Sequence, residues 1–400
     1  MSASLKGFEN AIDSRHRAAS SAVLRYLNAV SWNESGADDS RIKELLAQAS
    51  IAEGLQIVPL LDYRGVKLDI LDESSLMHTR TIKSIDGCVT AALCASQGIE
   101  RIVFESGGNT GTALATYALR LGIESFCIVP QDNLPLLDSG VFSSPLLHLI
   151  AVEDPGSLRE LISLVEGICG VSRVPRVPWR IMASEVVGCF VLEQLLGGRT
   201  YDYIAQSISA AFGPIGVYRV LERNDAPLPG FIGVQQAQNA AMYNSWRAGS
   251  IDIAPARFYS TKDLLSRVMY DATPQRYGTF DSLRDLLQRS GGFLTTVDHR
   301  EFDALIMRGP GIAALESLSE AGIDITWRGS EVFEKTGLMA LAGIFKQIDA
   351  GTIAPKSRVL CCLTGGTANP DGCAVPELRV CNASSARGEL LDRYGTRVTI

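Results

Sequence analysis

Histidines at metal-ligand spacing and paired cysteines are both missing from this sequence of 400 residues. The four histidines, His16, His78, His148 and His299, lie far apart, and the nine cysteines include no Cys-x-x-Cys pair. We therefore expect no metal site. An odd number of scattered cysteines without a disulfide framework is typical of reduced thiols, so we expect a cytoplasmic protein.

Long basic runs and long apolar runs are missing as well. The net charge is −7, and no basic stripe could neutralise phosphates, which argues against a nucleic-acid partner. The first ten residues lack the apolar core of a signal peptide, and no window is long enough to span a bilayer, so we expect no membrane segment. No Gly-x-Gly-x-x-Gly motif follows an early strand, which disfavours a nicotinamide-dependent Rossmann enzyme.

The chain does contain short apolar runs that alternate with helical patterns. Runs such as 102–104, 126–129 and 358–363 are typical of buried strands, and 46% of all residues are hydrophobic. This alternation predicts an α/β fold with parallel sheets covered on both faces. Residues 1–50 are predicted to form a peripheral helical arm, and residues 238–300 an insertion or lid.

One stretch, from Arg101 to Ala115, combines a strand, a glycine-rich turn and a helix. The turn from Ser106 to Gly111 separates the apolar run 102–104 from a helical pattern that ends at Gly122. A helix N-terminus with exposed N–H groups suits a carboxylate or phosphate. An ordinary strand-to-helix turn explains the glycines equally well.

Two further loops follow predicted strands in the same way. Residues 213–218 come after the strand at 203–208, and residues 364–367 come after the strand at 358–363. Ligands bind at the carboxyl ends of the strands in open parallel sheets. The sequence therefore predicts that three loops, 106–111, 213–218 and 364–367, meet at one ligand.

Lys83 is one of only eight lysines and precedes a helical pattern that continues to Gly98. The helix dipole disfavours a cation at this end, whereas a neutral amine is tolerated there. A neutral lysine amine is a nucleophile that can form a Schiff base. The alternative is a solvated lysine that merely tolerates the dipole.

The order and spacing of these motifs resemble the fold-type II pyridoxal-phosphate enzymes. Lys83, Ser-Gly-Gly-Asn-Thr-Gly, a mid-chain glycine loop and Leu-Thr-Gly-Gly after the last strand carry this resemblance over roughly residues 50–370. The family is tryptophan-synthase-β-like and includes threonine synthase, cysteine synthase, and serine or threonine dehydratases. It implies two open, twisted, mainly parallel sheets covered by helices, pyridoxal 5'-phosphate as cofactor, an amino acid substrate and a homodimer.

The resemblance also implies domains and residue roles. The large cofactor-binding domain would comprise 51–87 and 200–400, and the smaller substrate-carboxylate domain 88–199. Lys83 would form the Schiff base and move the α-proton, and Asn109 would bind the cofactor's 3-hydroxyl. The substrate carboxylate would be held by Ser106, Gly107, Gly108 and Thr110. The cofactor phosphate would be held by Gly213, Pro214, Ile215, Gly216 and Val217, and Thr364 would face the pyridine nitrogen.

Several residues depart from the family pattern. Ser84 and Ile85 follow the lysine where the family often has Asp-Arg, and Gly107 replaces a second hydroxyl residue. Pro214 removes an N–H donor from the phosphate loop, and Val217 brings no hydroxyl to it. These departures are typical of a divergent member with a specialised biosynthetic role.

The resemblance predicts β-elimination or β-replacement on an amino acid. Threonine-synthase-like γ-chemistry is an alternative, favoured slightly by Glu53-Gly54 before Pro59-Leu60. A second alternative is a ligand-binding relative without catalysis, which the weakened loop at 213–217 favours.

Overall fold

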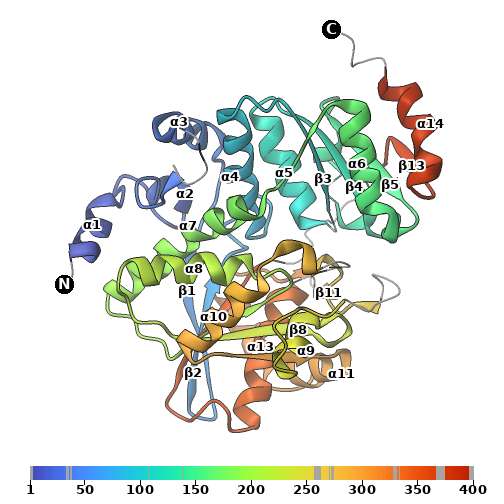
Figure 1. The fold of residues 1–400 in the computed structure, drawn as a ribbon. Coiled ribbons are helices and arrows are strands. Elements are labelled where there is room, and N and C mark those ends of the chain that lie inside the picture. Colours follow the sequence, from blue (N-terminus) through green and yellow to red (C-terminus); the bar gives the residue numbers. More distant parts are fainter. Residues whose placement is uncertain are drawn as a thin grey trace. The chain divides into compact units, whose positions relative to one another are not determined.

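The computed structural model describes residues 3–32, 36, 38–106, 108–137, 139–255, 263–269, 271, 274–327, 331–332, 334–365 and 374–395. The chain divides into two compact units. Unit 1 comprises Met1–Val30, Ala52–Ile82 and Ile181–Gly366, and unit 2 comprises Ser31–Ile51, Lys83–Arg180 and Thr367–Ile400. Each unit is built around its own sheet (Figure 1).

The sheet of unit 1 has six strands in the order β1-β2-β12-β7-β8-β9. Their bounds are β1 Gln56–Tyr63, β2 Val66–Asp72, β12 Arg358–Leu363, β7 Tyr203–Ser207, β8 Gly230–Gln236 and β9 Phe293–Val297. Only the hairpin β1–β2 is antiparallel within this sheet, so the carboxyl ends of β2, β12, β7, β8 and β9 share one edge. All seven residues of β8 are buried, as expected for a strand covered on both faces.

Helices cover the sheet of unit 1, and α13 contributes most to its core. Eleven of the fifteen residues of α13 are buried against β12, β7, β8 and β9. The helices of this unit are α1 Ala3–Ala11, α2 Ala22–Arg25, α8 Phe212–Arg223, α9 Ala241–Arg247, α10 Phe280–Ser290, α11 His299–Phe302, α12 Gly311–Glu320 and α13 Lys335–Asp349. Helix α7, Val177–Leu196, belongs to unit 1 from Ile181 onward. The short strands β10 Thr326–Trp327 and β11 Glu331–Val332 pair with each other.

Unit 2 is built on a wholly parallel sheet in the order β13-β5-β4-β3-β6. The strands are β13 Leu378–Val380, β5 Leu147–Val152, β4 Glu124–Pro130, β3 Arg101–Glu105 and β6 Ser172–Arg173. Its helices are α3 Asp39–Ala49, α4 Lys83–Ser96, α5 Asn109–Arg120, α6 Leu158–Cys169 and α14 Ala383–Tyr394. Helices α4 and α5 pack on each other, and α6 packs on β3, β4 and α14 (Figure 1).

The predicted α/β class with mainly parallel sheets is confirmed, but the predicted boundaries differ from the two units. The arm at 1–50 is divided, because its first part belongs to unit 1 while α3 packs on α4 in unit 2. The C-terminal strand β13 extends the sheet of unit 2 by pairing with β5, although 200–400 is predicted to be one domain. The predicted insertion at 238–300 contains β9, which is an edge strand of the main sheet.

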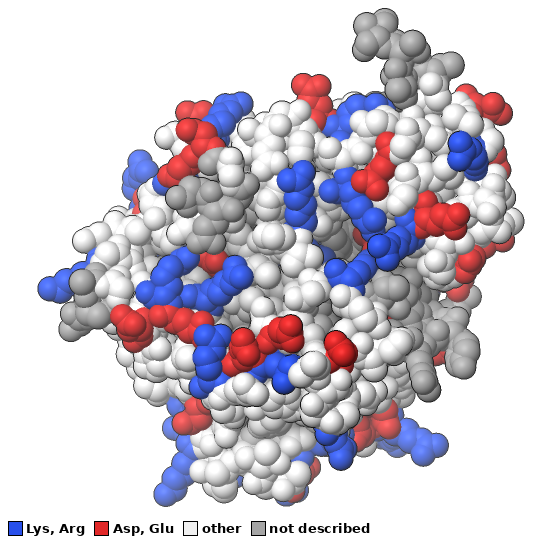
Figure 2. All heavy atoms as spheres, in the orientation of Figure 1, with Lys and Arg blue, Asp and Glu red and all other residues white. Residues whose placement is uncertain are grey.

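Surface charges of both signs are interspersed on the face shown in Figure 2. Among the described residues, no helix is long and apolar enough to cross a membrane. No group of three His, Cys, Asp or Glu side chains in this described part could hold a metal ion.

His148 connects the C-terminal segment to the sheet of unit 2. Its Nδ1 lies 2.8 Å from a Glu377 carboxylate oxygen, and its Nε2 lies 2.9 Å from a Glu124 oxygen. Each ring nitrogen thus faces a carboxylate oxygen. Arg393 and Tyr394 of α14 also donate to Glu377, at 2.6 and 3.1 Å. A network of charged groups therefore fastens β13 and α14 to the sheet.

We expect Glu377→Gln to destabilise the protein by about 1.5–3 kcal/mol at neutral pH, the value of hydrogen bonds to charged groups. Burial raises the pKa of the Glu377 carboxyl, but hydrogen bonds from Arg393 and His148 outweigh this and lower it. The ionised carboxylate therefore stabilises the fold above the pKa of an unfolded glutamate, and this stabilisation is lost as the pH falls through the folded pKa. Urea unfolding between pH 7 and pH 4 measures the difference.

The exposed Glu389 of α14 provides the matched control, Glu389→Gln. The difference in unfolding free energy between Glu377→Gln and wild type should shrink toward pH 4. A constant difference over this range would contradict the proposed charge effect.

Candidate active site

Lys83 is the first residue of α4, as its sequence context predicts. Its side chain is half-buried, while the eleven residues from Ser84 to Cys94 are all buried. The helix is therefore fixed in the core of unit 2 and holds the lysine at its N-terminal end. An amine at this end is disfavoured as a cation by the helix dipole.

The residues before Lys83 pack against the end of β12. The N–H of Ile82 donates to the carbonyl of Thr364 at 3.0 Å. Gly365 has a φ of +95°, and a Cβ added there would lie 2.4 Å from the Cα of Thr81. Only glycine fits this close approach. The chain that leads into Lys83 is thus bound directly to Thr364, the first residue of the loop predicted at 364–367. Residues 366 and 367 of that loop lie outside the described residues.

Ser106 stabilises the start of α5. Its Oγ accepts the N–H groups of Gly108 at 3.0 Å and Gly111 at 2.6 Å, and its hydroxyl donates to the Gly108 carbonyl at 3.2 Å. A Cβ on Gly111 would lie 2.6 Å from the Ser106 side chain, so a glycine is required there. Since its one proton is already donated, the Ser106 hydroxyl acts here as a helix cap. Gly107 lies outside the described residues.

Asn109 and Thr110 are the first two residues of α5, and both are half-buried. Gly108 precedes them as the N-cap, with a φ of +147°. The Thr110 Oγ1 accepts a hydrogen bond from Arg180 Nη2 at 3.3 Å. The glycine-rich turn is thus a helix N-terminus with two polar side chains at its first positions, a suitable place for a carboxylate.

The residues predicted to wrap a phosphate lie inside a helix. Helix α8 begins at Phe212, so Gly213 to Val217 belong to its first turn and a half. Pro214 has no N–H, and the N–H of Ile215 donates to Ala211 at 3.3 Å. Within an α-helix the N–H groups of Gly216 and Val217 donate to carbonyls four residues earlier. The structure thus does not form the expected five-residue loop, and the candidate anion site is reduced to the helix start near Gly213.

Gly216 has a packing role in this helix. A Cβ added to it would lie 2.4 Å from the Ile181 carbonyl and 2.6 Å from the Ser184 Cβ, both on α7. Overpacking of this kind costs about 1–3 kcal/mol. We therefore expect Gly216→Ala to lower the unfolding free energy by that amount in denaturant titrations.

The matched control is Gly213→Ala, whose Cβ would meet only the end of the Gln206 side chain. It should destabilise the protein less than Gly216→Ala does. Equal stability of Gly216→Ala and wild type would contradict the close approach of α7 and α8.

Glu334 is a fully buried carboxyl at the N-terminus of α13, and one of its oxygens accepts the Gly337 N–H. The other, Oε2, is buried without a hydrogen-bond partner. Burial, and secondly the negative charge of Asp72, raise the pKa of Glu334 to about 8. A Cβ on Gly337 would touch Glu334 and also lie 2.8 Å from the Cα of Leu363, which places the Glu334 carboxyl beside the end of β12.

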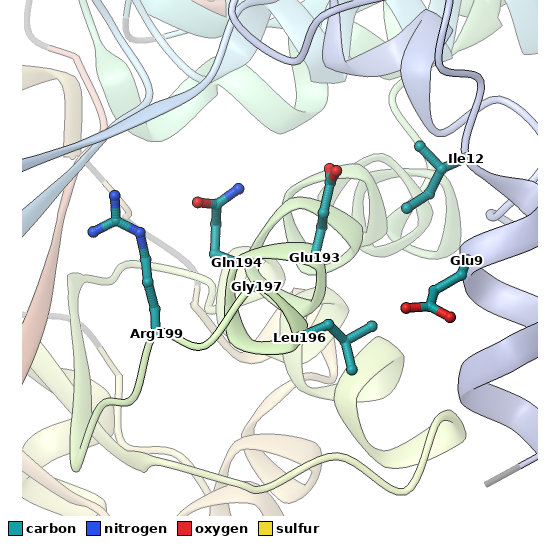
Figure 3. Close-up of a pocket in the computed structure, with 7 residues that line it drawn as sticks. All are labelled: Glu9, Ile12, Glu193, Gln194, Leu196, Gly197 and Arg199. Carbon is teal, nitrogen blue, oxygen red and sulfur yellow. The ribbon is translucent and has the colours of Figure 1, made fainter. Parts of the chain in front are cut away.

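A pocket of about 370 Å³ lies elsewhere in unit 1 (Figure 3). It is lined by Glu9, Ile12, Glu193, Gln194, Leu196, Gly197 and Arg199. Glu193 is already bound by Arg25 and Tyr26, and Arg199 precedes the amino end of β7. The pocket is therefore at the opposite edge of the sheet from Thr364 and contains no predicted site residue.

Asp86, Arg180 and Glu334 were not among the residues predicted for the site. Asp86 follows Lys83 by three residues, so its place one turn further along the same helix face could have been inferred from spacing. Arg180 is 94 residues from its partner Asp86, and no local pattern indicates that contact. Glu334 precedes a helix as a cap does, but its burial depends on tertiary packing.

Comparison with known proteins finds distant sequence relatives and solved structures with a similar fold. No family model matches the sequence. The chain is 26% identical over 311 residues to cysteate synthase of Methanosarcina acetivorans, which covers 74% of this chain and 70% of the relative.

Two solved structures show the same fold. Threonine synthase from Escherichia coli superposes with a TM-score of 0.64 at 12% identity, over 97% of this chain and 90% of that one. Diaminopropionate ammonia lyase from Escherichia coli, solved with an aminoacrylate–PLP azomethine intermediate, gives 0.60 at 16% identity, over 82% and 88%. The predicted fold-type II, tryptophan-synthase-β-like fold is confirmed, as is the resemblance to threonine-synthase-like enzymes.

Proposed function

We propose that this protein is an enzyme that uses pyridoxal 5'-phosphate to catalyse elimination or replacement on an amino acid, with Lys83 as the Schiff-base lysine. One observation carries the proposal most directly. The residue before Lys83 is hydrogen-bonded to Thr364, the residue that the family resemblance assigns to the pyridine nitrogen. Two of the motifs predicted from sequence are thereby joined in the fold, although 280 residues separate them.

The side chains present fit such a cofactor. A half-buried lysine lies at a helix start, Thr364 ends a buried strand, and Glu334 Oε2 is a buried polar atom without a partner nearby. Gly365 allows the chain after Thr364 to lie directly against Thr81. Lys83, Asn109, Gly213 and Thr364 would hold the group.

Lys83, the start of α5 and Thr364 would then each have a separate role in the reaction. When bound, the cofactor supplies an electron sink for the charge that develops on the substrate α-carbon. Lys83 takes the α-proton, and its place at a helix N-terminus favours the neutral amine that this requires. The start of α5, with Thr110 and the Gly108 turn, binds the substrate carboxylate. The neutral hydroxyl of Thr364 would leave the pyridine nitrogen largely unprotonated, which favours elimination or replacement over transamination.

We propose β-chemistry in preference to γ-chemistry. Cysteate, named in the relative at 26% identity, carries its sulfonate on the β-carbon. Threonine synthase of Methanosarcina acetivorans is also a sequence relative, but at 22% identity over 312 residues, against 26% for cysteate synthase. We further propose a cytoplasmic homodimer, as the family resemblance and the scattered cysteines indicate.

A ligand-binding role without catalysis is the second candidate. The start of α8 favours it, because Pro214 removes an N–H donor from the turn that would face a phosphate. Such a protein would stay colourless after pyridoxal phosphate is added.

Absorbance and borohydride reduction test the two candidates. Purified protein, incubated with pyridoxal phosphate, should show a visible band that borohydride removes. Peptide mass mapping should then find a phosphopyridoxyl group on the Lys83 peptide. Absence of both the band and the adduct would overturn the proposed function and favour the non-catalytic one.

A further inference from the structure

Arg180 connects the first turns of α4 and α5 in unit 2. Its Nε donates to Oδ2 of Asp86 at 2.9 Å, and its Nη2 lies 2.7 Å from the same oxygen in an ion pair. Nη2 donates to Thr110 Oγ1 at 3.3 Å. The side chains of Arg180 and Asp86 are 14% and 10% exposed. A shielded ion pair of this kind holds the guanidinium in a fixed orientation.

The contact with Arg180 determines which way the Thr110 hydroxyl can donate. A threonine hydroxyl has one proton and two acceptor lone pairs, and an arginine has donors only. Because Arg180 donates to the Thr110 oxygen, the Thr110 proton must point elsewhere. Ser106 differs, since its proton is donated to the Gly108 carbonyl. Of the two hydroxyls predicted to bind the substrate, Thr110 is therefore the one able to donate.

Asp86 contacts Arg180 through only one of its two carboxylate oxygens. Both arginine donors meet Oδ2, while Oδ1 is buried without a hydrogen-bond partner. The carboxylate thus orients the guanidinium without using all its donors, and one of these reaches Thr110. The positive charge beside the start of α5 adds to that of the helix dipole.

We propose that Arg180, held by Asp86, is a positioning residue that directs the Thr110 hydroxyl toward the α-carboxylate of the substrate. This inference rests on the proposed function, because it assigns a partner to the carboxylate. It predicts that Arg180 affects recognition of the carboxylate alone and acts through Thr110.

Binding of L-serine and of its carboxamide, L-serinamide, to the cofactor-loaded protein tests the inference. Both ligands can be followed through the change in cofactor absorbance, and only L-serine has a carboxylate. Thr110→Val should weaken L-serine binding about tenfold, the loss expected for one hydrogen bond to a charged group. It should leave L-serinamide binding unchanged.

Removing Arg180 alone would leave Asp86 buried without its partner, a change that can prevent folding. The double variant Asp86→Asn/Arg180→Gln removes both charges together, and Arg180→Lys keeps the charge with a single donor group. The double variant and Arg180→Lys should each lose affinity for L-serine and not for L-serinamide. Adding Thr110→Val to either one should not lower the affinity for L-serine any further. Arg101→Gln, which breaks a comparable ion pair with Glu124 in the same unit, is the matched control and should bind L-serine normally.

Hydrogen exchange at the start of α5 gives a readout that does not depend on the cofactor. Peptides that cover 108–117 should exchange faster in the Asp86→Asn/Arg180→Gln variant than in wild type. The role of Arg180 would be overturned by unchanged exchange of the 108–117 peptides in the double variant. It would also be overturned if the variants lost equal affinity for L-serine and L-serinamide, or if the wild-type protein did not respond to L-serine. Absence of the Lys83 adduct would instead overturn the proposed function itself.

Discussion

Replacement of Lys83 by alanine should abolish the borohydride-trapped adduct and lower the activity by at least about 10³-fold. A general base contributes about 10²–10⁴-fold to a rate, and this lysine would also bind the cofactor covalently. The effect should be chemical and not structural, because Lys83 is a half-buried residue at the end of a buried helix. Mass mapping after reduction and a steady-state assay of keto acid release measure the two losses.

A control variant and a chemical rescue test whether the loss is specific to the Lys83 amine. Lys346→Ala is the matched control, since Lys346 is another partly buried lysine, bound to the Thr296 carbonyl and to Glu301. It should retain the Lys83 adduct and the activity. Methylamine supplied to Lys83→Ala should restore part of the rate, because a small amine can replace the missing base. A variant that keeps both adduct and activity would contradict the assignment of Lys83.

The fold was predictable because its strands are recognisable from local patterns. Apolar runs such as 358–363 are buried strands in the structure. The order of the loops along the chain resembles that of the fold-type II pyridoxal-phosphate enzymes. The boundaries of the units were not predictable in the same way. Strand β13 pairs with β5 across more than two hundred residues, and such a contact leaves no local pattern in the sequence.

The loop predicted at 213–218 is part of a helix, and this difference has a physical cause. Glycine and proline close together are typical of loops, but both are tolerated in the first turn of a helix, where Pro214 loses no intrahelical hydrogen bond. Gly216 is small because α7 lies against it. Local sequence shows that a small residue is present, whereas the reason for it lies in a helix contact that the sequence does not show.

Local patterns in the sequence also indicated part of the candidate site, but not the contacts between distant segments. Lys83 and Thr364 lie at the ends of elements, where patterns are strongest, and the structure joins their neighbours through Ile82. The hydrogen bonds of Ser106 to Gly108 and Gly111 were not predictable, because whether a hydroxyl caps a helix depends on the loop conformation. Arg180 depends on a contact between distant segments.

Replacement of Glu334 by glutamine should stabilise the protein by several kcal/mol at pH 8 and have little effect near pH 4.5. Burial, and then Asp72, raise the pKa of Glu334 to about 8 in the folded protein from its ordinary value of 4.5. The folded protein therefore holds a proton that the unfolded chain releases. Its stability falls as the pH rises from the unfolded to the folded pKa, at about 1.4 kcal/mol per unit of pKa difference. Glutamine is neutral at every pH and avoids this cost.

Thermal or urea unfolding of both proteins between pH 4.5 and pH 8 provides the measurement, in one state of cofactor loading. The glutamine side chain of the variant keeps an oxygen for the Gly337 N–H, so the cap of α13 is retained. Glu316→Gln, at an exposed position of α12, is the matched control and should give a difference that does not vary with pH. A difference for Glu334→Gln that is equally constant would show that Glu334 is ionised in the folded protein. A difference that grows with pH would show that a neutral carboxyl, able to donate its proton, lies beside the end of β12.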